Sequence, residues 1–166
     1  MFFGLFKKKP EPDDDDQNIA VGNTNIRYKP DLIDDLKSDH AHLLNVYTDI
    51  KIASDSKDFT KVEEHLITFR NELEDHLLKE KINLYIYLSH LLKSDATNAS
   101  LISGFRKEMD GISSIVMKFL VKYESIGTDI NLHNSFQKEF ATIGEVLGQR
   151  IKREESQLYS LYVPPS

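Results

Sequence analysis

The chain contains no cysteine and no tryptophan, and it has only seven glycines and five prolines among 166 residues. Without cysteine the protein forms no disulfide, and thiol catalysis, cysteine-ligated zinc and iron–sulfur clusters are excluded. Any metal site must therefore use histidine and carboxylate side chains. The scarcity of glycine and proline favours long, uninterrupted helices over a sheet protein with many turns.

Basic residues are also in the minority, with 21 Lys and Arg against 27 Asp and Glu, which gives a net charge of −6. Affinity for DNA or RNA comes from Lys and Arg that neutralise phosphates, so we expect no nucleic-acid partner. The hydrophobic fraction of 40% is enough to fill one core. A chain of this length is typical of a single domain.

The first thirty residues differ in composition from the rest. The apolar residues 1–6 precede three lysines, and residues 10–16 contain only proline and acidic side chains. The apolar run is too short for a signal peptide or a membrane span. We therefore predict that residues 1–30 form a flexible leader with an acidic linker. The alternative is that residues 1–9 contact a membrane surface.

Four helical segments are predicted after this leader, separated by short clusters of turn-forming residues. Asp31 can cap the first helix, and Pro164 must end the last. Because connections of about five residues join neighbouring helices antiparallel, we predict an all-α, up-down-up-down four-helix bundle over residues 31–163. The expected helices span residues 31–53, 59–93, 99–125 and 130–163.

Apolar residues recur at steps of three and four along each segment, as expected for a helix with one buried face. Polar residues interrupt these apolar stripes at five positions. Burying a polar or charged group costs free energy unless the group is paired, so these interruptions are the main indication of function. The five residues are His40, His76, Glu80, Arg150 and Glu154.

The second and fourth segments repeat each other at a constant offset of 74 residues. Their sequences are HLLKEKINLY at 76–85 and RIKREESQLY at 150–159. Glu80 is matched by Glu154, whereas His76 is matched by Arg150. The chain is therefore interpreted as two related helical hairpins.

His76 and Glu80 are four residues apart, and side chains at this spacing project from the same face of a helix. Both can ligate one cation. Imidazole and carboxylate ligands suit iron, zinc or manganese, and the interiors of four-helix bundles hold carboxylate-rich di-iron sites. The pattern is thus compatible with a metal site inside the bundle.

Over roughly residues 31–162 the chain resembles the hemerythrin-like, or HHE cation-binding, family. The resemblance rests on an Asp39-His40 pair, on H-x-x-x-E followed by Leu-Tyr at 76–85, and on E-E-x-x-L-Y at 154–159. It implies an antiparallel four-helix bundle with a non-haem di-iron centre. Members of the family serve in oxygen transport, in oxygen or redox sensing, or in iron handling.

The chain departs from the family pattern at two ligand positions. The histidine of the third helix is absent, with Met109 nearest in register, and the histidine position of the fourth helix holds Arg150. An arginine is a permanent cation that repels a second metal ion, so one iron ion is favoured over two. By the resemblance, the remaining candidate ligands are His40, His76, Glu80 and Glu154.

Two alternatives remain open at this point. Arg150 can pair with Glu80 or Glu154, which would give a polar core network without any metal cofactor. The fourth helix, over residues 136–158, also resembles the regulator-of-sigma-D family of bacterial anti-sigma factors. That resemblance implies a metal-free four-helix bundle with a sigma factor as its protein partner. It covers the second helix only loosely, so the hemerythrin-like resemblance ranks first.

From these observations we expect a bacterial, cytoplasmic module that binds iron or another divalent metal and acts in redox or oxygen sensing. The alternative is a regulatory, protein-binding bundle similar to anti-sigma factors. The chain has no G-x-S-x-G motif and no spacing that supports a nucleophile–base pair, so we do not expect an enzyme. The other four histidines are expected to be ordinary exposed or capping residues: His42, His65, His90 and His133.

Overall fold

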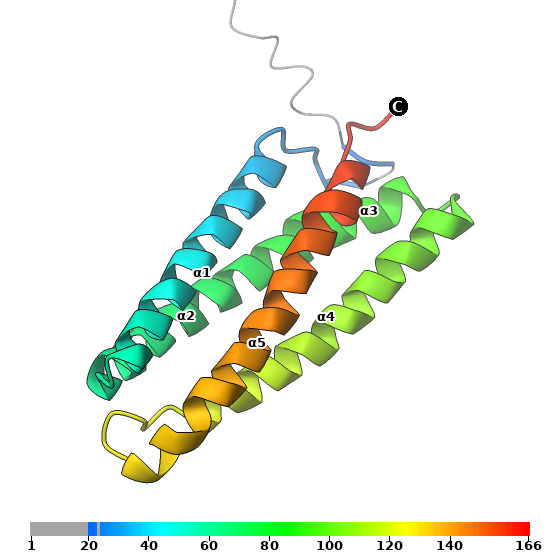
Figure 1. The fold of residues 1–166 in the computed structure, drawn as a ribbon. Coiled ribbons are helices and arrows are strands. Elements are labelled where there is room, and N and C mark those ends of the chain that lie inside the picture. Colours follow the sequence, from blue (N-terminus) through cyan, green and yellow to red (C-terminus); the bar gives the residue numbers. More distant parts are fainter. Residues whose placement is uncertain (1–19, 23) are drawn as a thin grey trace, which may run out of the picture.

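The computed structural model describes residues 20–22 and 24–166, and within them it contains four long helices and no strand. The helices run alternately up and down, as Figure 1 shows. The all-α four-helix bundle expected from the sequence is thus confirmed. The first bundle helix is α1 (Leu32–Asp55), and the second is α2 (Phe59–Lys79), continued by η1 (Glu80–Tyr85) and α3 (Ile86–Leu91). The third is α4 (Ala96–Lys122). After the turn η2 (Ile130–Leu132), the fourth is α5 (His133–Arg153), continued by η3 (Glu154–Leu158) and η4 (Tyr159–Leu161).

Aspartate caps set the starts of two helices. The side chain of Asp58 accepts a hydrogen bond from the backbone N–H of Lys61, and that of Asp95 accepts one from Asn98. Such caps satisfy backbone donors that have no partner within the helix. The cap at Asp95 lets α4 begin at residue 96, three residues before the predicted start.

The helix predicted for residues 59–93 is not a uniform α-helix, and neither is the last one. Each contains a π-helical segment, η1 and η3, in which backbone hydrogen bonds join residues five apart. The segments begin at Glu80 and Glu154, the matching residues of the internal repeat. π-Helical turns inside α-helices are rare and are frequent at functional sites.

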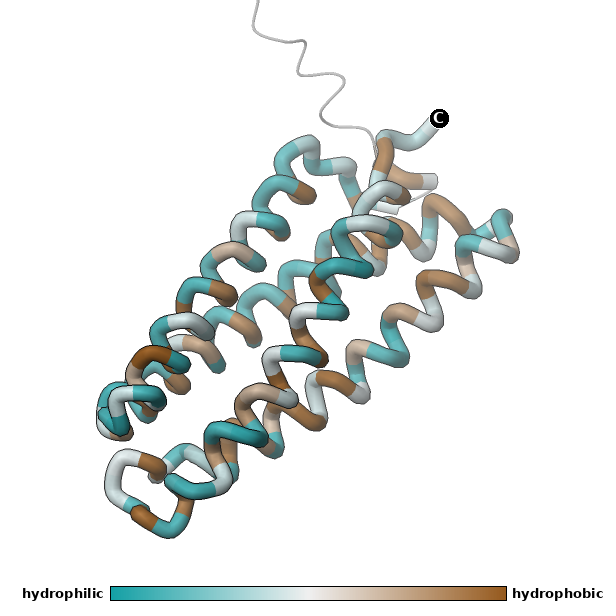
Figure 2. Tube along the Cα trace, viewed as in Figure 1, coloured by the Kyte–Doolittle hydropathy of each residue, from teal (hydrophilic) through white to brown (hydrophobic). Residues whose placement is uncertain are grey.

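Two apolar clusters form the core, and a polar layer separates them. One cluster includes Leu43, Phe69 and Phe140, and the other includes Leu36 and Leu158. Figure 2 shows hydrophobic positions recurring along each helix, as the periodicity predicted. Burial of each large apolar side chain contributes about 1.5–3 kcal/mol, so the clusters hold the polar layer between two rigid blocks.

The segment before α1 packs against the end of the bundle that carries the C-terminus (Figure 1). Val21 is only 2% exposed and belongs to the second apolar cluster. The backbone N–H of Lys29 donates to the Tyr162 hydroxyl at 2.7 Å. Val21 and Lys29, within the predicted leader, therefore contact the bundle. The predictions for residues 1–19, including membrane contact by residues 1–9, lie outside the described residues.

Candidate metal centre

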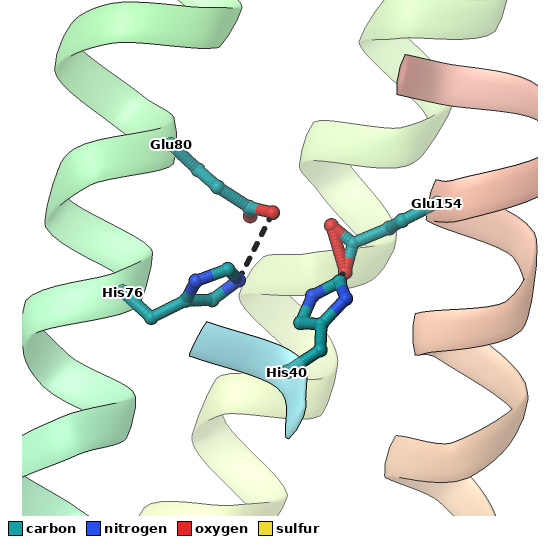
Figure 3. A group of neighbouring side chains, drawn as sticks. All are labelled: His40, His76, Glu80 and Glu154. Carbon is teal, nitrogen blue, oxygen red and sulfur yellow. Dashed lines mark ion pairs between the residues drawn. The ribbon is translucent and has the colours of Figure 1, made fainter. Parts of the chain in front are cut away.

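The four candidate ligands meet in the polar layer between the two apolar clusters. His40 comes from α1, His76 from α2, Glu80 from the start of η1 and Glu154 from the start of η3. Figure 3 shows their side chains pointing toward one another. Each residue is at most 3% exposed, and one ligand atom of each lies within 4.8 Å of all the others. The helices thus bring together residues as far apart in sequence as 40 and 154.

The separations of the donor atoms suit one cation. Nε2 of His76 lies 3.1 Å from Oε1 of Glu80, and Nε2 of His40 lies 3.9 Å from Oε1 of Glu154. Metal–ligand bonds of about 2.1 Å place neighbouring ligand atoms roughly 3.0 Å apart and opposite ones roughly 4.2 Å apart. Both separations fall in this range.

Neighbouring carboxylates orient the two imidazoles. Nδ1 of His76 lies 2.9 Å from Oδ2 of Asp39, which also accepts a hydrogen bond from Nζ of Lys79. Nδ1 of His40 lies 3.4 Å from Oε2 of Glu155. A carboxylate on the outer nitrogen fixes the ring and presents the inner Nε2 to a metal. His76 therefore has the support that metal-ligating imidazoles require, whereas Nδ1 of His40 is near Glu155 but makes no hydrogen bond.

Arg150 lies beside the four donors, on the side that faces α4. It is 1% exposed, and its Nε lies 3.5 Å from Oε1 of Glu154. Its Nη2 donates to the Tyr85 hydroxyl at 2.7 Å, and its Nη1 lies 3.5 Å from Glu108 of α4. The guanidinium also lies 4.7 Å from the ring centre of Phe105. It thus places a permanent positive charge on the α4 side of the polar layer.

Two tyrosines complete the layer, and the apolar stripes did not predict them. The Tyr159 hydroxyl donates to Oε1 of Glu80 at 2.6 Å and lies 3.2 Å from Nε2 of His40. Tyr85 bonds Arg150 on the opposite side. The available signal was the internal repeat, which ends in Leu-Tyr in both copies.

The two carboxyl groups carry unequal charge when no cation is bound. Burial raises the pKa of Glu154, and the nearby Glu80 carboxylate raises it further, to about 10, despite Arg150. Burial also disfavours the charge on Glu80, but contacts with His76, Glu154 and Tyr159 outweigh it and lower its pKa to about 2. Glu80 is therefore ionised at neutral pH, and Glu154 holds a proton.

The two histidines also differ. Burial by itself lowers the pKa of His76, but the carboxylates of Glu80 and Asp39 raise it above its ordinary value. Burial and the positive charge of His76 lower the pKa of His40. A cation that binds here displaces the protons on Glu154 and His76, so its affinity increases with pH.

The donor set fits a metal ion because several of its buried atoms have no hydrogen-bond partner. These atoms include Nε2 of His76, Oε2 of Glu80 and Oε2 of Glu154. Buried polar atoms are normally paired, and a site that leaves several unpaired beside one another is suited to a bound ion. Two imidazoles and two carboxylates are suitable ligands for iron, manganese or zinc.

A small cavity of about 80 Å³ adjoins the site. His40, His76, Arg150 and Glu154 line its polar end, and most of the remaining wall is apolar. Met109, the α4 residue nearest in register to the missing histidine, also lines it and is 8% exposed. The cavity is large enough for a molecule of only a few atoms.

The remaining histidines take no part in this group of donors. His42 and His90 are exposed, and His65 of α2 is half-buried. His133 is half-buried at the start of α5, where its Nε2 lies 2.8 Å from the carbonyl oxygen of Ile126. Its ring also stacks on Phe59.

The chain thus has the architecture of a helical cation-binding domain, a four-helix bundle with two histidines and two glutamates buried at its centre. Residues 31–162 match the family described as the Hemerythrin HHE cation binding domain. This match covers most of the chain, and the chain belongs to that family. A search of curated proteins and a search of solved structures found no match. None of these findings supports the second resemblance, to the anti-sigma family.

Proposed function

We propose that the protein binds one metal ion, iron in the first instance, through His40, His76, Glu80 and Glu154. The observation that carries this proposal is the convergence of these four buried donors within 4.8 Å of one another. The family match supports it, because the family is described as cation-binding. Arg150 supports a single ion, because its fixed charge on the α4 side opposes a second cation.

We propose further that this site serves in redox or oxygen sensing. When bound, iron supplies a centre that can change its oxidation state. His40, His76, Glu80 and Glu154 would hold it, and the two apolar clusters keep bulk water away from them. The cavity of about 80 Å³ beside His40 and His76 admits only a small molecule such as dioxygen, which supports this role.

We propose no nucleic-acid partner, because the composition is acidic, and no reaction, because the sequence has no catalytic motif. Among the described residues, no helix is long and apolar enough to cross a membrane. The bacterial origin and the cytoplasmic location remain predictions from the sequence.

Elemental analysis of the protein after expression in iron-supplemented medium tests the metal-binding proposal. We expect one iron ion per chain in the wild type, and loss of the metal in the variants His76→Ala and Glu80→Ala. The matched control is His42→Ala, because His42 is on the same helix as His40 but is exposed. A metal-free wild type, with a His76→Ala variant that is merely less stable, would contradict the proposal.

The competing function is a metal-free bundle that binds a regulatory partner. It is favoured by the contacts of Arg150 with Glu154 and Tyr85, which hold the polar layer together without an ion. This function predicts that the immobilised protein retains a sigma factor at low salt. Failure to retain any sigma factor would remove it.

A further inference from the structure

The hydroxyl group of Tyr159 lies among the candidate ligands. It is 2.6 Å from Oε1 of Glu80 and 3.2 Å from Nε2 of His40, and the residue is only 3% exposed. Both neighbouring atoms belong to residues that are proposed to bind the metal ion. The phenol oxygen therefore borders two ligand atoms at once.

These two distances are those expected between ligands of one ion. Bonds of about 2.1 Å place neighbouring ligand atoms roughly 3.0 Å apart, and the Tyr159 oxygen lies near this distance from Glu80 and from His40. A group that supports a metal-ligating imidazole from outside contacts its outer nitrogen, as Asp39 contacts Nδ1 of His76. Tyr159 instead contacts the inner Nε2 of His40.

The π-helical segment η3 brings Tyr159 to this position. The backbone N–H of Tyr159 bonds the carbonyl oxygen of Glu154, five residues earlier, so the two residues lie one above the other on the inner face of the helix. In a regular α-helix, residues five apart are turned from each other by about 140°. Without the π-helical turn the ring would point away from Glu154.

The internal repeat supplies a contrasting residue in Tyr85. It is the last residue of η1, whereas Tyr159 directly follows η3, and it is also buried, at 5% exposure. Its hydroxyl accepts a hydrogen bond from Arg150, a cation that cannot ligate a metal. Only one of the two equivalent tyrosines therefore faces the donors.

We propose that Tyr159 is a fifth ligand of the metal ion, an inference that rests on the proposed metal-binding function. On binding, the O–H bond of Tyr159 breaks, its proton passes to solvent, and the phenolate oxygen forms a bond to the cation. With Glu80 and Glu154, this phenolate brings three negative charges to the site. Arg150 beside Glu154 offsets one of these charges, and the set of three oxygen and two imidazole donors suits iron.

Visible absorption and resonance Raman spectra of the full chain loaded with ferric iron test this assignment. A phenolate bound to ferric iron gives an intense visible charge-transfer band, and excitation into this band enhances the vibrations of the tyrosine ring. We expect the band in the wild type and in Tyr85→Phe, and its loss in Tyr159→Phe. Tyr159→Phe should still bind iron through the other four residues, as measured by elemental analysis.

Iron that binds to the wild type without this band, or with a band that survives in Tyr159→Phe, would overturn the assignment and leave the metal-binding function intact. A wild type that takes up no iron would overturn both. The wild-type Raman spectrum alone shows whether any tyrosine ligates the iron. If Tyr159→Phe fails to fold, a band that persists in Tyr85→Phe still excludes the other tyrosine of the layer, and a wild type without the band overturns the assignment.

Discussion

Nε of Arg150 lies 3.5 Å from Oε1 of Glu154, and in the matching half of the repeat Nε2 of His76 lies 3.1 Å from Oε1 of Glu80. The two helices thus present the same arrangement, a basic side chain four residues before a glutamate. The histidine can lose its proton and bind a metal, whereas the arginine keeps its charge. One half of the bundle therefore offers a histidine that can bind a cation, whereas the other half already contains a permanent one.

This asymmetry predicts how many metal ions the protein holds. Replacing Arg150 and Met109 together by histidine removes the fixed charge and places two imidazoles on the α4 side of the layer. We expect the Met109→His, Arg150→His variant to bind two iron ions per chain where the wild type binds one, because the repulsion is gone and ligands are added. Elemental analysis of the purified proteins measures the ratio.

The matched control for this variant is Arg153→His, one turn further along α5. Arg153 is half-buried and pairs with Glu108 outside the group of donors, so its replacement should leave the ratio at one. A double variant that is folded by circular dichroism but still binds a single ion would show that Arg150 does not limit the site.

Glu80 should be the most important carboxylate for the stability of the metal-free protein. The variant Glu80→Gln removes the fully buried partner of His76, which keeps only the partly exposed Asp39, and Tyr159 loses a strong acceptor. Breaking a buried ion pair in this way costs about 3–5 kcal/mol. Urea unfolding in the presence of a chelator measures this loss in the free energy of unfolding.

Glu155→Gln is the comparison for this measurement. Glu155 also contacts a histidine of the site, His40, but its side chain is 35% exposed. Pairs that solvent reaches contribute at most about 1 kcal/mol. Equal losses in Glu80→Gln and Glu155→Gln would mean that His76 is not held as a cation.

The sequence was sufficient to predict the bundle and to single out the residues of its polar layer. Steps of three and four fix which side of each helix is buried, so any polar residue on that side must enter the core. For this reason His40, His76, Glu80, Arg150 and Glu154 could be selected without coordinates, and all five are buried. Their convergence at one level followed from the antiparallel arrangement of the helices.

The two tyrosines could not be predicted from the same rule. At 100° per residue, Tyr85 and Tyr159 lie about 140° away from Glu80 and Glu154, off the buried face. The π-helical turns change this angle, and nothing in local helix propensity signals such a turn. The direction in which the Arg150 side chain extends could not be predicted either, because Glu108 and Phe105 on α4 contact its guanidinium only in the folded bundle.

Stability of the metal-free protein should fall between pH 7 and pH 9. The pKa of Glu154 is raised from 4.5 to about 10, so its contribution is complete below pH 4.5 and is lost as the pH rises toward 10. The pKa of His76 is also raised, so its contribution is complete below 6.5 and is lost at higher pH. Urea unfolding with chelator at the two pH values measures the difference.

Glu154→Gln tests which group causes the alkaline loss. A glutamine has nearly the same shape and is neutral at both pH values, so we expect stability at pH 7 to change little and the decline toward pH 9 to become smaller. Glu155→Gln should retain the full decline, because Glu155 lies outside the carboxyl pair. A wild type that is equally stable at pH 7 and pH 9 would be inconsistent with a protonated Glu154.

Gly144 provides a prediction about packing beside the cavity. The hydroxyl of Tyr47 lies where a side chain at position 144 would begin, and it donates to the carbonyl oxygen of Phe140 at 3.1 Å. The ring also stacks on Phe140 with its centre 4.1 Å away, so it has little room to move. We expect Gly144→Ala to lower the free energy of unfolding by about 1–3 kcal/mol through overpacking.

Gly148→Ala, one turn further along the same helix, separates this clash from helix propensity. Apart from its chain neighbours and the adjoining helix backbone, no atom lies within 4 Å of the position that its new methyl group would take, and alanine is favoured over glycine inside a helix by about 0.5–1 kcal/mol. The two alanine variants should therefore shift stability in opposite directions in urea unfolding.

Removing the ring with Tyr47→Ala should make Gly144→Ala nearly harmless, because the clash exists only while Tyr47 is present. Additive effects in the double variant would show that Tyr47 is not what excludes a side chain at position 144.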